Sequence, residues 1–432
     1  MKTLKTEYLI IGNSSAGVAC IEGIREIDKA GNITVVSDEN IFNYSRPLIS
    51  YLLGNRVKKK NMFFRSRNFY DENKVNLVLD NKAKKLDVKR KIVYFANSQS
   101  IKFDKLLIAT GGSPIIPEIK GSQLNGVFTF TTFNDAVAIK DYIKKHTVKH
   151  AVVIGGGLIG LKAVEALVEL GIKISIIELA DRILSTTFDT KASGIIQNAL
   201  KKTGCNIFTK NTVVEILSED KENKAKLVTL KTREKIQADL VITAIGVRPN
   251  IQLVNNTSIV THRGILVDET MQTNVKDIYA AGDVCEADTL LDEDKKNIPI
   301  WPNAFKQGKI AGENMAGGNA VYTGSIAMNS VELCGIPTIS IGKTSLEQDK
   351  YEILEMNKKE ESVYKKSVLE NNHIVGCIFV GNIERAGIYT GLIMNKIDIS
   401  SIKDRLLEND FGVLALPEKY RKHLVGDVGL EV

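Results

Sequence analysis

Two stretches of the chain repeat one pattern of hydrophobic and polar positions. Each begins with a run of apolar residues, continues through a glycine-containing turn and an amphipathic stretch, and ends in a second apolar run. The first copy spans residues 8–39 and the second spans residues 151–178. Short apolar runs bounded by turns are typical of buried strands, and apolar residues at helical spacing are typical of a helix. Each copy therefore predicts a βαβ unit of a doubly wound parallel sheet.

The remaining segments predict how these two units are embedded in the chain. Residues 75–95 alternate like antiparallel strands, and three further apolar runs end in glycine. A helix is expected from about Asn303 to Met315, and short β-like runs followed by helical segments begin at Ser325. We therefore expect an α/β chain of two doubly wound domains and a C-terminal α+β domain, with boundaries at residues 1–118 and 246–324 (a discontinuous first domain), 119–245 and 325–432.

Composition narrows the class of protein. The 432 residues weigh 47.6 kDa and are 44% hydrophobic and 25% charged, which excludes a disordered or collagen-like chain. No run approaches the ~18 apolar residues that a membrane helix needs, and the apolar N-terminal run is interpreted as a first strand rather than a signal peptide. The five cysteines are far apart and the histidines lack metal spacing. We therefore expect no metal site, and we expect the protein to be cytoplasmic.

The formal net charge of +7 is a mild excess for a chain of this length. Lysine pairs and triplets recur along it without interleaved aromatic residues. They are solvated faces or, alternatively, a docking patch for an acidic partner, which opposite charge would attract. Nucleic acid is not expected as a partner, because no recognition motif accompanies the charge.

The second glycine turn carries a complete dinucleotide-binding pattern, G-x-G-x-x-G, between a strand and a helix. Glycines there permit a tight turn and close approach of the backbone to a pyrophosphate, which the helix N-terminus attracts. The residues of this turn that are expected to contact the nucleotide are Gly155, Gly157, Leu158, Ile159 and Gly160.

The acidic residue that ends the next strand indicates which nucleotide binds. Glu178 can accept hydrogen bonds from an adenosine ribose and would repel a 2′-phosphate, which favours NADH over NADPH. One alternative is that Glu178 merely faces solvent. Another is that Arg182 recruits a 2′-phosphate.

The first glycine turn is less regular than the second. A serine replaces the middle glycine, and its hydroxyl could donate to a phosphate oxygen while crowding the pyrophosphate slightly. Ser37 stands where an acidic ribose ligand is usual, so that Asp38 or Glu39 is the alternative ligand. The residues of this turn that are expected to bind a dinucleotide are Gly12, Ser14, Ser15, Ala16 and Gly17.

The order of motifs along the chain is more specific than either turn. Three strand ends follow in the order Ala109-Thr110-Gly111, Ala244-Ile245-Gly246 and Gly282-Asp283. This arrangement resembles the pyridine nucleotide–disulfide oxidoreductase superfamily, flavoproteins with two dinucleotide-binding domains, and the resemblance covers essentially the whole chain. It implies a Rossmann-like FAD domain, a Rossmann-like NAD(H) domain and a C-terminal interface domain that forms a homodimer.

The resemblance also assigns further residues to the cofactors. Asp283 is implied to bind the ribityl or pyrophosphate region of FAD. The segment of residues 300–304, together with Gln307 and Gly308, is implied to place a helix N-terminus against the flavin, where it would stabilise the negative charge of the reduced ring. Trp301, the only tryptophan, is expected near that ring, with plain packing as the alternative. The other positions expected to contact FAD or NADH are Ala83, Thr110, Gly111, Gly246, Gly282, Pro302, Asn303 and Ala304.

Residues 42–51 distinguish this chain from the disulfide reductases of the superfamily. Those enzymes carry two cysteines after the first βαβ unit, and related oxidases and coenzyme A-disulfide reductases carry one, whereas this segment contains none. It instead resembles the Arg-Pro-x-x-Ser-Lys stretch of rubredoxin, ferredoxin and nitrite-reductase-type NADH reductases. Arg46 and Pro47 are thereby expected at the FAD diphosphate. Thiolate chemistry at the flavin is not available from this loop.

Two departures from those relatives suggest a hypothesis about charge near the flavin. Where they often carry lysine in that stretch and glutamate after the NAD turn, this chain has Tyr51 and Lys162. We hypothesise that Lys162 restores a cation near the flavin or nicotinamide, and that Tyr51 stacks or hydrogen-bonds there. The alternative is a solvent-facing helical lysine.

These observations together predict an FAD-dependent NADH:acceptor oxidoreductase. NADH is expected to deliver a hydride to flavin N5, and the electrons are expected to pass to an acidic iron–sulfur carrier such as rubredoxin or ferredoxin, or to a partner redox subunit. The alternatives are an NADH oxidase that forms hydrogen peroxide and a non-catalytic flavoprotein that senses NADH.

Overall fold

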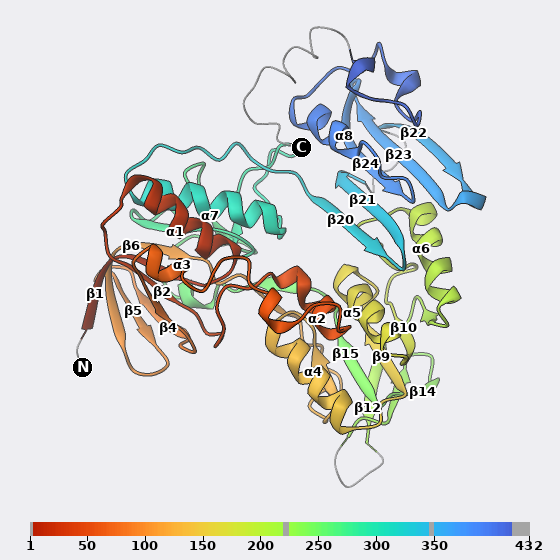
Figure 1. Cartoon of the computed structure of the whole chain (residues 1–432), viewed down its shortest axis with the longest axis horizontal. Helices are drawn as coiled ribbons and strands as arrows, with labels where there is room; N and C mark the ends of the chain where they lie inside the picture. Colours follow the sequence, from red (N-terminus) through yellow and green to blue (C-terminus); the bar gives the residue numbers. More distant parts are fainter. Residues whose placement is uncertain (1–2, 219–223, 345–349, 417–432) are drawn as a thin grey trace. The chain divides into compact units, whose positions relative to one another are not determined.

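The computed structural model describes residues 3–218, 224–344 and 350–416 (Figure 1). The chain divides into two compact units, each of which is described by itself. The three-domain division expected from the sequence cuts the chain differently and stays a prediction. Unit 1 comprises Met1–Glu118, Gly126–Val148 and Ile242–Ser325, and unit 2 comprises Ile119–Asn125, Lys149–Val241 and Ile326–Val432.

The first βαβ pattern forms the centre of a seven-stranded sheet in unit 1. The strand order is β3-β2-β1-β6-β5-β4, and β18 also pairs with β6. β1 is parallel to β2 and β6, while β4, β5 and β6 are antiparallel. β3 is parallel to β2, so the antiparallel prediction for residues 75–95 was wrong for its first strand. The strands are β1 (Thr3–Ile11), β2 (Ile33–Val36), β3 (Val75–Val78), β4 (Ala83–Asp87), β5 (Ile92–Phe95), β6 (Ser100–Ile108) and β18 (Ile278–Ala280).

Two helices from opposite ends of unit 1, α1 (Ser15–Ile27) and α7 (Trp301–Met315), pack against each other beside this sheet (Figure 1). Glycines make the approach close. A Cβ at Gly308 would clash with the Ala16 carbonyl, and one at Gly312 would clash with the Cys20 carbonyl. The other elements of unit 1 are α2 (Ile49–Leu53), α3 (Phe69–Glu72), α4 (Phe133–Lys145), β7 (Gly112–Pro114), β8 (Val127–Thr129), β16 (Val247–Pro249), β17 (Ile265–Leu266) and β19 (Cys285–Glu286).

The second βαβ pattern forms the parallel run β11-β10-β9 in unit 2. After their first residues, β9 and β10 are buried throughout and apolar except for Ser175, as expected for a sheet covered on both faces. A separate antiparallel sheet has the order β12-β13-β14. These elements are β9 (His150–Ile154), α5 (Leu158–Glu169), β10 (Lys173–Ile177), α6 (Thr190–Lys202), β11 (Asn206–Phe208), β12 (Val213–Leu217), β13 (Leu227–Leu230) and β14 (Lys235–Gln237). The strand β15 (Leu240–Thr243) includes the boundary between Val241 of unit 2 and Ile242 of unit 1.

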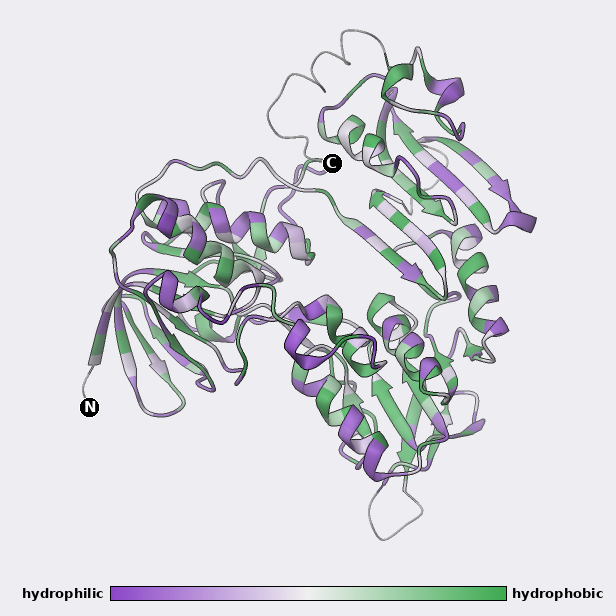
Figure 2. Cartoon of the chain, in the orientation of Figure 1, coloured by the Kyte–Doolittle hydropathy of each residue, from purple (hydrophilic) through white to green (hydrophobic). Residues whose placement is uncertain are grey.

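The C-terminal part of unit 2 is a five-stranded antiparallel sheet with one helix, which matches the expected α+β composition. The strand order is β20-β21-β24-β23-β22. Hydrophobic and hydrophilic residues are mixed along the edge strand β20 (Figure 2), whereas the central strand β24 is buried from Ile374 to Val380. The elements are β20 (Met328–Leu333), β21 (Ile336–Gly342), β22 (Glu352–Lys358), β23 (Val363–Glu370), β24 (His373–Val380) and α8 (Ala386–Met394).

Candidate cofactor sites

The turn between β1 and α1 has the backbone that a bound pyrophosphate requires. Gly12 has φ +118°, and a Cβ there would clash with the Ala109 carbonyl. Gly17 is equally constrained, because a Cβ on it would clash with the carbonyl of Gly12. Ser14 precedes the helix, and its side chain makes no capping hydrogen bond. The first amides of α1 are thus presented without an anionic partner from the helix itself.

Residues distant in sequence converge on this turn. A Cβ on Gly282 would lie 3.3 Å from the Ala16 Cβ and 3.4 Å from the Ala304 Cβ, so that the turn, β18 and the start of α7 meet here. The Ser15 hydroxyl donates to the Trp301 carbonyl (3.3 Å). The Gly282 amide donates to Gln307 Oε1 (2.9 Å), a contact that sequence analysis missed. Five residues that were expected near FAD therefore lie together, from three separate segments: Ser15, Ala16, Gly282, Trp301 and Ala304.

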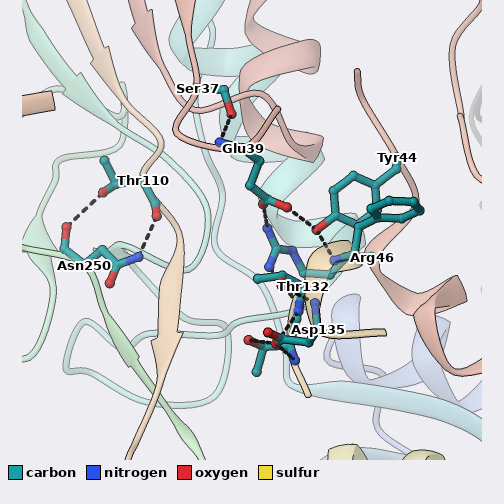
Figure 3. A network of polar contacts seen from close by, with 10 residues as sticks. Ser37, Glu39, Tyr44, Arg46, Thr110, Thr132, Asp135 and Asn250 are labelled. Carbon is teal, nitrogen blue, oxygen red and sulfur yellow. Dashed lines mark hydrogen bonds and ion pairs between the residues drawn. The ribbon is translucent and has the colours of Figure 1, made fainter. Parts of the chain in front are cut away.

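Asp283 and Arg46 share one electrostatic environment. Burial raises the pKa of Asp283, and the guanidinium of Arg46 partly offsets that rise. Arg46 forms an ion pair with Glu39 (Nη2 to Oε1, 2.8 Å) and donates from Nη1 to the Thr131 carbonyl (2.9 Å), as Figure 3 shows for Glu39. Glu39 is therefore used to hold Arg46, which leaves the exposed Asp38 as the acid available for a ribose.

Tyr44 completes the network around Arg46 (Figure 3). Its hydroxyl donates to Glu39 Oε2 (2.8 Å) and accepts from the Phe133 amide (3.1 Å). The neighbouring helix α4 begins with a capping box, in which Thr132 Oγ1 accepts from the Asp135 amide and Asp135 accepts from the Thr132 amide. Arg46 is thereby fixed between the loop after β2 and the start of α4.

The strand end at Thr110 is held by a residue that the sequence motifs did not identify. The Thr110 hydroxyl donates to the Asn250 carbonyl, and Asn250 Nδ2 donates to the Thr110 carbonyl, both at 2.9 Å (Figure 3). Gly111 has φ +62° with open space where a Cβ would stand.

Two further expected residues also lie in unit 1. Gly246, expected at NADH, has φ +124°. Ala83 begins β4 opposite Phe95.

The turn between β9 and α5 repeats the geometry of the first turn. Gly155 has φ +107°, and a Cβ on Gly160 would clash with the Gly155 carbonyl. Gly157 has no atom within 4 Å of the place where a Cβ would stand. The first turn of α5 contains no acidic residue and no side-chain cap. Open space above uncapped amides fits a pyrophosphate.

Glu178 lies against this turn in unit 2. Its Oε2 accepts from the Gly156 amide (2.6 Å) and its Oε1 accepts from the Ala180 amide (2.7 Å). Leu179, the next residue, is 71% exposed, and Ile159, in the first turn of α5, is 37% exposed. Two exposed apolar side chains next to a carboxylate suit the base and ribose of a nucleotide. Leu179 was missed in the sequence, where its only signal is its position after the strand-end acid.

The caps of the long helices separate binding helices from structural ones. The five helices of at least twelve residues in the described chain are α1, α4, α5, α6 and α7. Side chains cap α4 (Thr132) and α6 (Asp189), whereas α1, α5 and α7 have no side-chain cap and no acidic residue in the first turn. A helix N-terminus left with its amides free attracts negative charge. The residues present therefore fit FAD in unit 1 and a second dinucleotide in unit 2.

The three residues expected to act in catalysis lie as follows. Trp301 begins α7 and packs edge-on against Phe64, with ring centroids 4.9 Å apart. Tyr51 lies in α2, and the Arg56 guanidinium lies 5.6 Å above its ring. Lys162 forms an ion pair with Glu165 and donates to the Glu332 carbonyl (3.4 Å).

Two expected FAD residues at the start of α7 have structural partners. Pro302 occupies the first turn, where its missing amide costs nothing. Asn303 is buried, donating from Nδ2 to the Ile298 carbonyl (3.0 Å) and accepting from the Tyr322 hydroxyl (2.7 Å). Pro47 similarly lies in the short 3₁₀ turn Arg46–Leu48.

None of the five cysteines is placed as an active thiolate. Four are buried, and burial raises the pKa of Cys285 and Cys377 to about 12 and that of the half-buried Cys334 to about 11. Within the described residues, no group of His, Cys, Asp and Glu could hold a metal ion. Among the helices of those residues, none combines the length and apolarity needed to cross a bilayer.

Two glycine turns with uncapped helices, each following a parallel strand, define a protein with two dinucleotide sites. The family model described as "Pyridine nucleotide-disulphide oxidoreductase" matches residues 6–308, and one described as "Rubredoxin NAD+ reductase C-terminal domain" matches residues 328–397. The chain belongs to the pyridine nucleotide–disulphide oxidoreductase family. It is an FAD-dependent NAD(P)H oxidoreductase with FAD and NAD(H) as cofactors.

Individual relatives agree with this assignment. The chain is 31% identical, over 94% of its length and 96% of the relative's, to the NADH-dependent phenylglyoxylate dehydrogenase subunit epsilon of Aromatoleum evansii. Among solved structures it resembles a NAD-dependent persulfide reductase from A. fulgidus (TM-score 0.85, 27% identity, 94% and 79% of the two chains). It also resembles the NADH:rubredoxin oxidoreductase of Clostridium acetobutylicum (TM-score 0.76, 26% identity, 92% and 97%).

Proposed function

We propose that this flavoprotein passes electrons from NADH, through FAD, to an acidic iron–sulfur protein such as rubredoxin or ferredoxin, or to a partner redox subunit. The observation that carries the proposal is the absence of cysteine from residues 42–51. Electrons then have no thiol route out of the flavin, because the cysteines elsewhere have raised pKa values. The relative named as a dehydrogenase subunit and the match to rubredoxin reductases support a protein acceptor.

The proposed function assigns one set of residues to an FAD site and another to an NADH site. When bound, FAD supplies the chemistry, taking a hydride from the nicotinamide and passing electrons on. Arg46 would hold the diphosphate, and the N-terminus of α7 would stabilise negative charge on the reduced ring. The turn at Gly155–Gly160 would bind the second pyrophosphate, and Glu178 would select NADH over NADPH.

Lys162 and Tyr51 are proposed to tune the transfer from NADH. Changing Lys162→Glu should slow flavin reduction by NADH, because it replaces a cation of the NAD-binding helix with an anion. The Glu165 carboxylate already beside it would then repel the new one. Lys162→Met, which removes the charge without adding repulsion, is the matched control and should have the smaller effect. An unchanged rate of bleaching in Lys162→Glu would dispose of the hypothesis.

Anaerobic stopped-flow absorbance tests the function as a whole. The yellow protein is mixed with NADH or NADPH, and the reduced protein is then mixed with rubredoxin, ferredoxin or oxygen. Fast bleaching by NADH and fast reoxidation by an iron–sulfur carrier are expected. Reoxidation by oxygen alone would favour an NADH oxidase that forms hydrogen peroxide. Slow reoxidation by every acceptor, with self-association dependent on NADH, would favour a non-catalytic sensor.

We further propose a cytoplasmic homodimer whose interface is formed by residues 325–432. The described part of that segment is an antiparallel sheet in which β20 and β22 are edge strands. An edge strand presents unpaired backbone groups that a second copy can pair with. Sedimentation equilibrium of the flavin-loaded protein should give twice the chain mass of 47.6 kDa.

A further inference from the structure

One segment of unit 1 departs from the balanced charge of the chain. The whole sequence has 58 Lys and Arg against 51 Asp and Glu, yet residues 40–70 contain no acidic residue and seven basic ones. The segment includes Arg46 and α2, and its Lys58, Lys59 and Lys60 are exposed. A local excess of this size creates a positive potential that a near-neutral average conceals.

Helix α4 packs against α2 (Figure 1), and its lysines extend the same positive charge. Lys59 Nζ lies 5.1 Å from the centre of the Phe133 ring, at the start of α4. About two turns further along the helix, Lys140 Nζ donates to the Leu52 carbonyl (2.9 Å) and to Asn55 Oδ1 (2.8 Å). We call the resulting set the lysine surface, which consists of Lys58, Lys59, Lys60, Lys140, Lys144 and Lys145.

Little acidic charge balances this surface from its own elements. Of the two aspartates in α4, Asp135 accepts from the amides of Thr131 and Thr132 at the helix start, and Asp141 is exposed. Partial burial lowers the pKa of Lys140, and the neighbouring charge of Lys144 lowers it further, while Asp141 opposes the change. Like charges are therefore crowded along α4, where a partner of opposite charge would relieve the repulsion.

The lysine surface begins beside the segment assigned to FAD. Arg46 Nη1 donates to the Thr131 carbonyl, and the Phe133 amide donates to the Tyr44 hydroxyl. The first turn of α4, against which Lys59 lies, is thus attached directly to the residues around the proposed diphosphate ligand. A protein bound on the lysine surface would be held next to the flavin segment.

We propose that the lysine surface is the docking site for the acidic iron–sulfur acceptor. This inference rests on the proposed function. NADH yields NAD⁺, a proton and two electrons, so two one-electron carriers must dock for each NADH oxidised. Opposite charge raises the encounter rate of each docking event, and salt screens that advantage.

The test compares two triple charge reversals in flavin-loaded protein. Lys58→Glu/Lys60→Glu/Lys144→Glu changes the lysine surface. Lys84→Glu/Lys85→Glu/Lys89→Glu makes the same change in net charge on exposed lysines at β4, in the same unit. Stopped flow measures reoxidation of the reduced proteins by a plant-type [2Fe–2S] ferredoxin, by rubredoxin and by menadione, a small uncharged acceptor, at low and high salt.

Reoxidation of the lysine-surface variant by ferredoxin or rubredoxin should be slower about tenfold or more at low salt, and the difference should shrink at high salt. The β4 variant should behave like wild type with the carriers, and both variants should match wild type with menadione. Equal losses in the two variants, or none in the first, would overturn the docking site while leaving the function intact. Wild type that reacts with menadione but with neither carrier would refute the proposed acceptor and this inference together.

A second measurement does not depend on a variant folding correctly. Carbodiimide cross-linking of wild type to ferredoxin joins lysines to carboxylates in contact, and mass spectrometry should find the cross-links at Lys58, Lys60 and Lys144. Cross-links confined to other lysines would contradict the proposal. An RNA-binding result would contradict it as well. If labelled single-stranded RNA binds wild type but not the lysine-surface variant, while that variant still reduces the carriers, the surface serves nucleic acid.

Discussion

The glycine turn of unit 1 and the glycine turn of unit 2 share a backbone but differ at the strand end that follows. In both, the first glycine has a positive φ and the last cannot carry a Cβ. In both, the strand-end side chain accepts from the amide two residues later, Ser37 Oγ from Glu39 (3.2 Å) and Glu178 Oε1 from Ala180. Ser37 thus occupies the place of Glu178 without its charge.

Two acids, Asp38 and Glu39, follow Ser37 in unit 1, and Glu39 has contacts different from those of Glu178. Glu39 binds Arg46 and Tyr44, whereas Glu178 lies on the glycine turn itself. Under the proposed function, Glu39 would orient Arg46 toward a phosphate, and Glu178 would stand where a ribose binds. A shared βαβ pattern therefore predicts a dinucleotide, and the use of its acid distinguishes FAD from NADH.

The largest effect is expected from breaking each turn separately. Gly12→Ala forces φ +118° on a residue with a Cβ that clashes with the Ala109 carbonyl, at a cost of roughly 3 kcal/mol or more. That variant should be purified without flavin. Gly160→Ala should keep its yellow colour but lose most bleaching by NADH. Absorbance spectra and stopped flow measure the two results, and loss of flavin from Gly160→Ala would contradict the separation.

A milder change isolates ligand binding from folding. Gly157→Ala places a methyl group in open space at φ −80°, so its melting temperature should match wild type. The methyl group should nevertheless raise the dissociation constant for NADH about tenfold, or about 1.4 kcal/mol, by occupying the pyrophosphate site. Titration of NADH under anaerobic conditions checks it. Ser14→Ala is the matched change in unit 1 and should leave NADH binding unaltered.

The strand-end acid should control the choice of nucleotide. Glu178→Gln keeps the shape of the side chain but removes the charge that repels a 2′-phosphate, so the preference for NADH over NADPH should fall about tenfold. The ratio of kcat/KM values for the two nucleotides measures it. Asp38→Asn, the corresponding neutralisation in unit 1, should not change that ratio. An unaltered preference in Glu178→Gln would exclude the charge of Glu178 as its cause.

The smallest effect concerns the turns after the two helices. After α1, the amides of Gly31 and Ala30 and the Tyr8 hydroxyl hold the pKa of Asp28 below its ordinary value. A lowered carboxyl pKa stabilises the fold above about pH 4 and loses that contribution as pH falls through the folded-state value. Urea unfolding should find Asp28→Asn less stable than wild type at pH 7 and equal to it in acid. A difference that persists in acid would exclude the charge as its cause. In unit 2, the corresponding turn after α5 contains Gly171, with φ +76°, in place of a carboxylate.

Sequence reasoning succeeded where the determinants are local. The glycine turns, the strand ends at Thr110 and Asp283, and the helix at Trp301 follow from short patterns. It missed Asn250, and it named Gln307 without its contact to Gly282, because these contacts join segments more than 20 residues apart and follow no short spacing rule. The contact of Lys162 with the carbonyl of Glu332 was likewise beyond it, since 170 residues separate the two.

The contact between α1 and α7 has a consequence for cofactor length. Gly308 and Gly312 bring α7 against the backbone of α1, which fixes the spacing between the proposed pyrophosphate helix α1 and the proposed flavin helix α7. The distance between the two proposed cofactor contacts is therefore fixed by the fold. A flavin mononucleotide, which lacks the adenosine half of FAD, would make only one of these two contacts. It should therefore be a poor substitute for FAD.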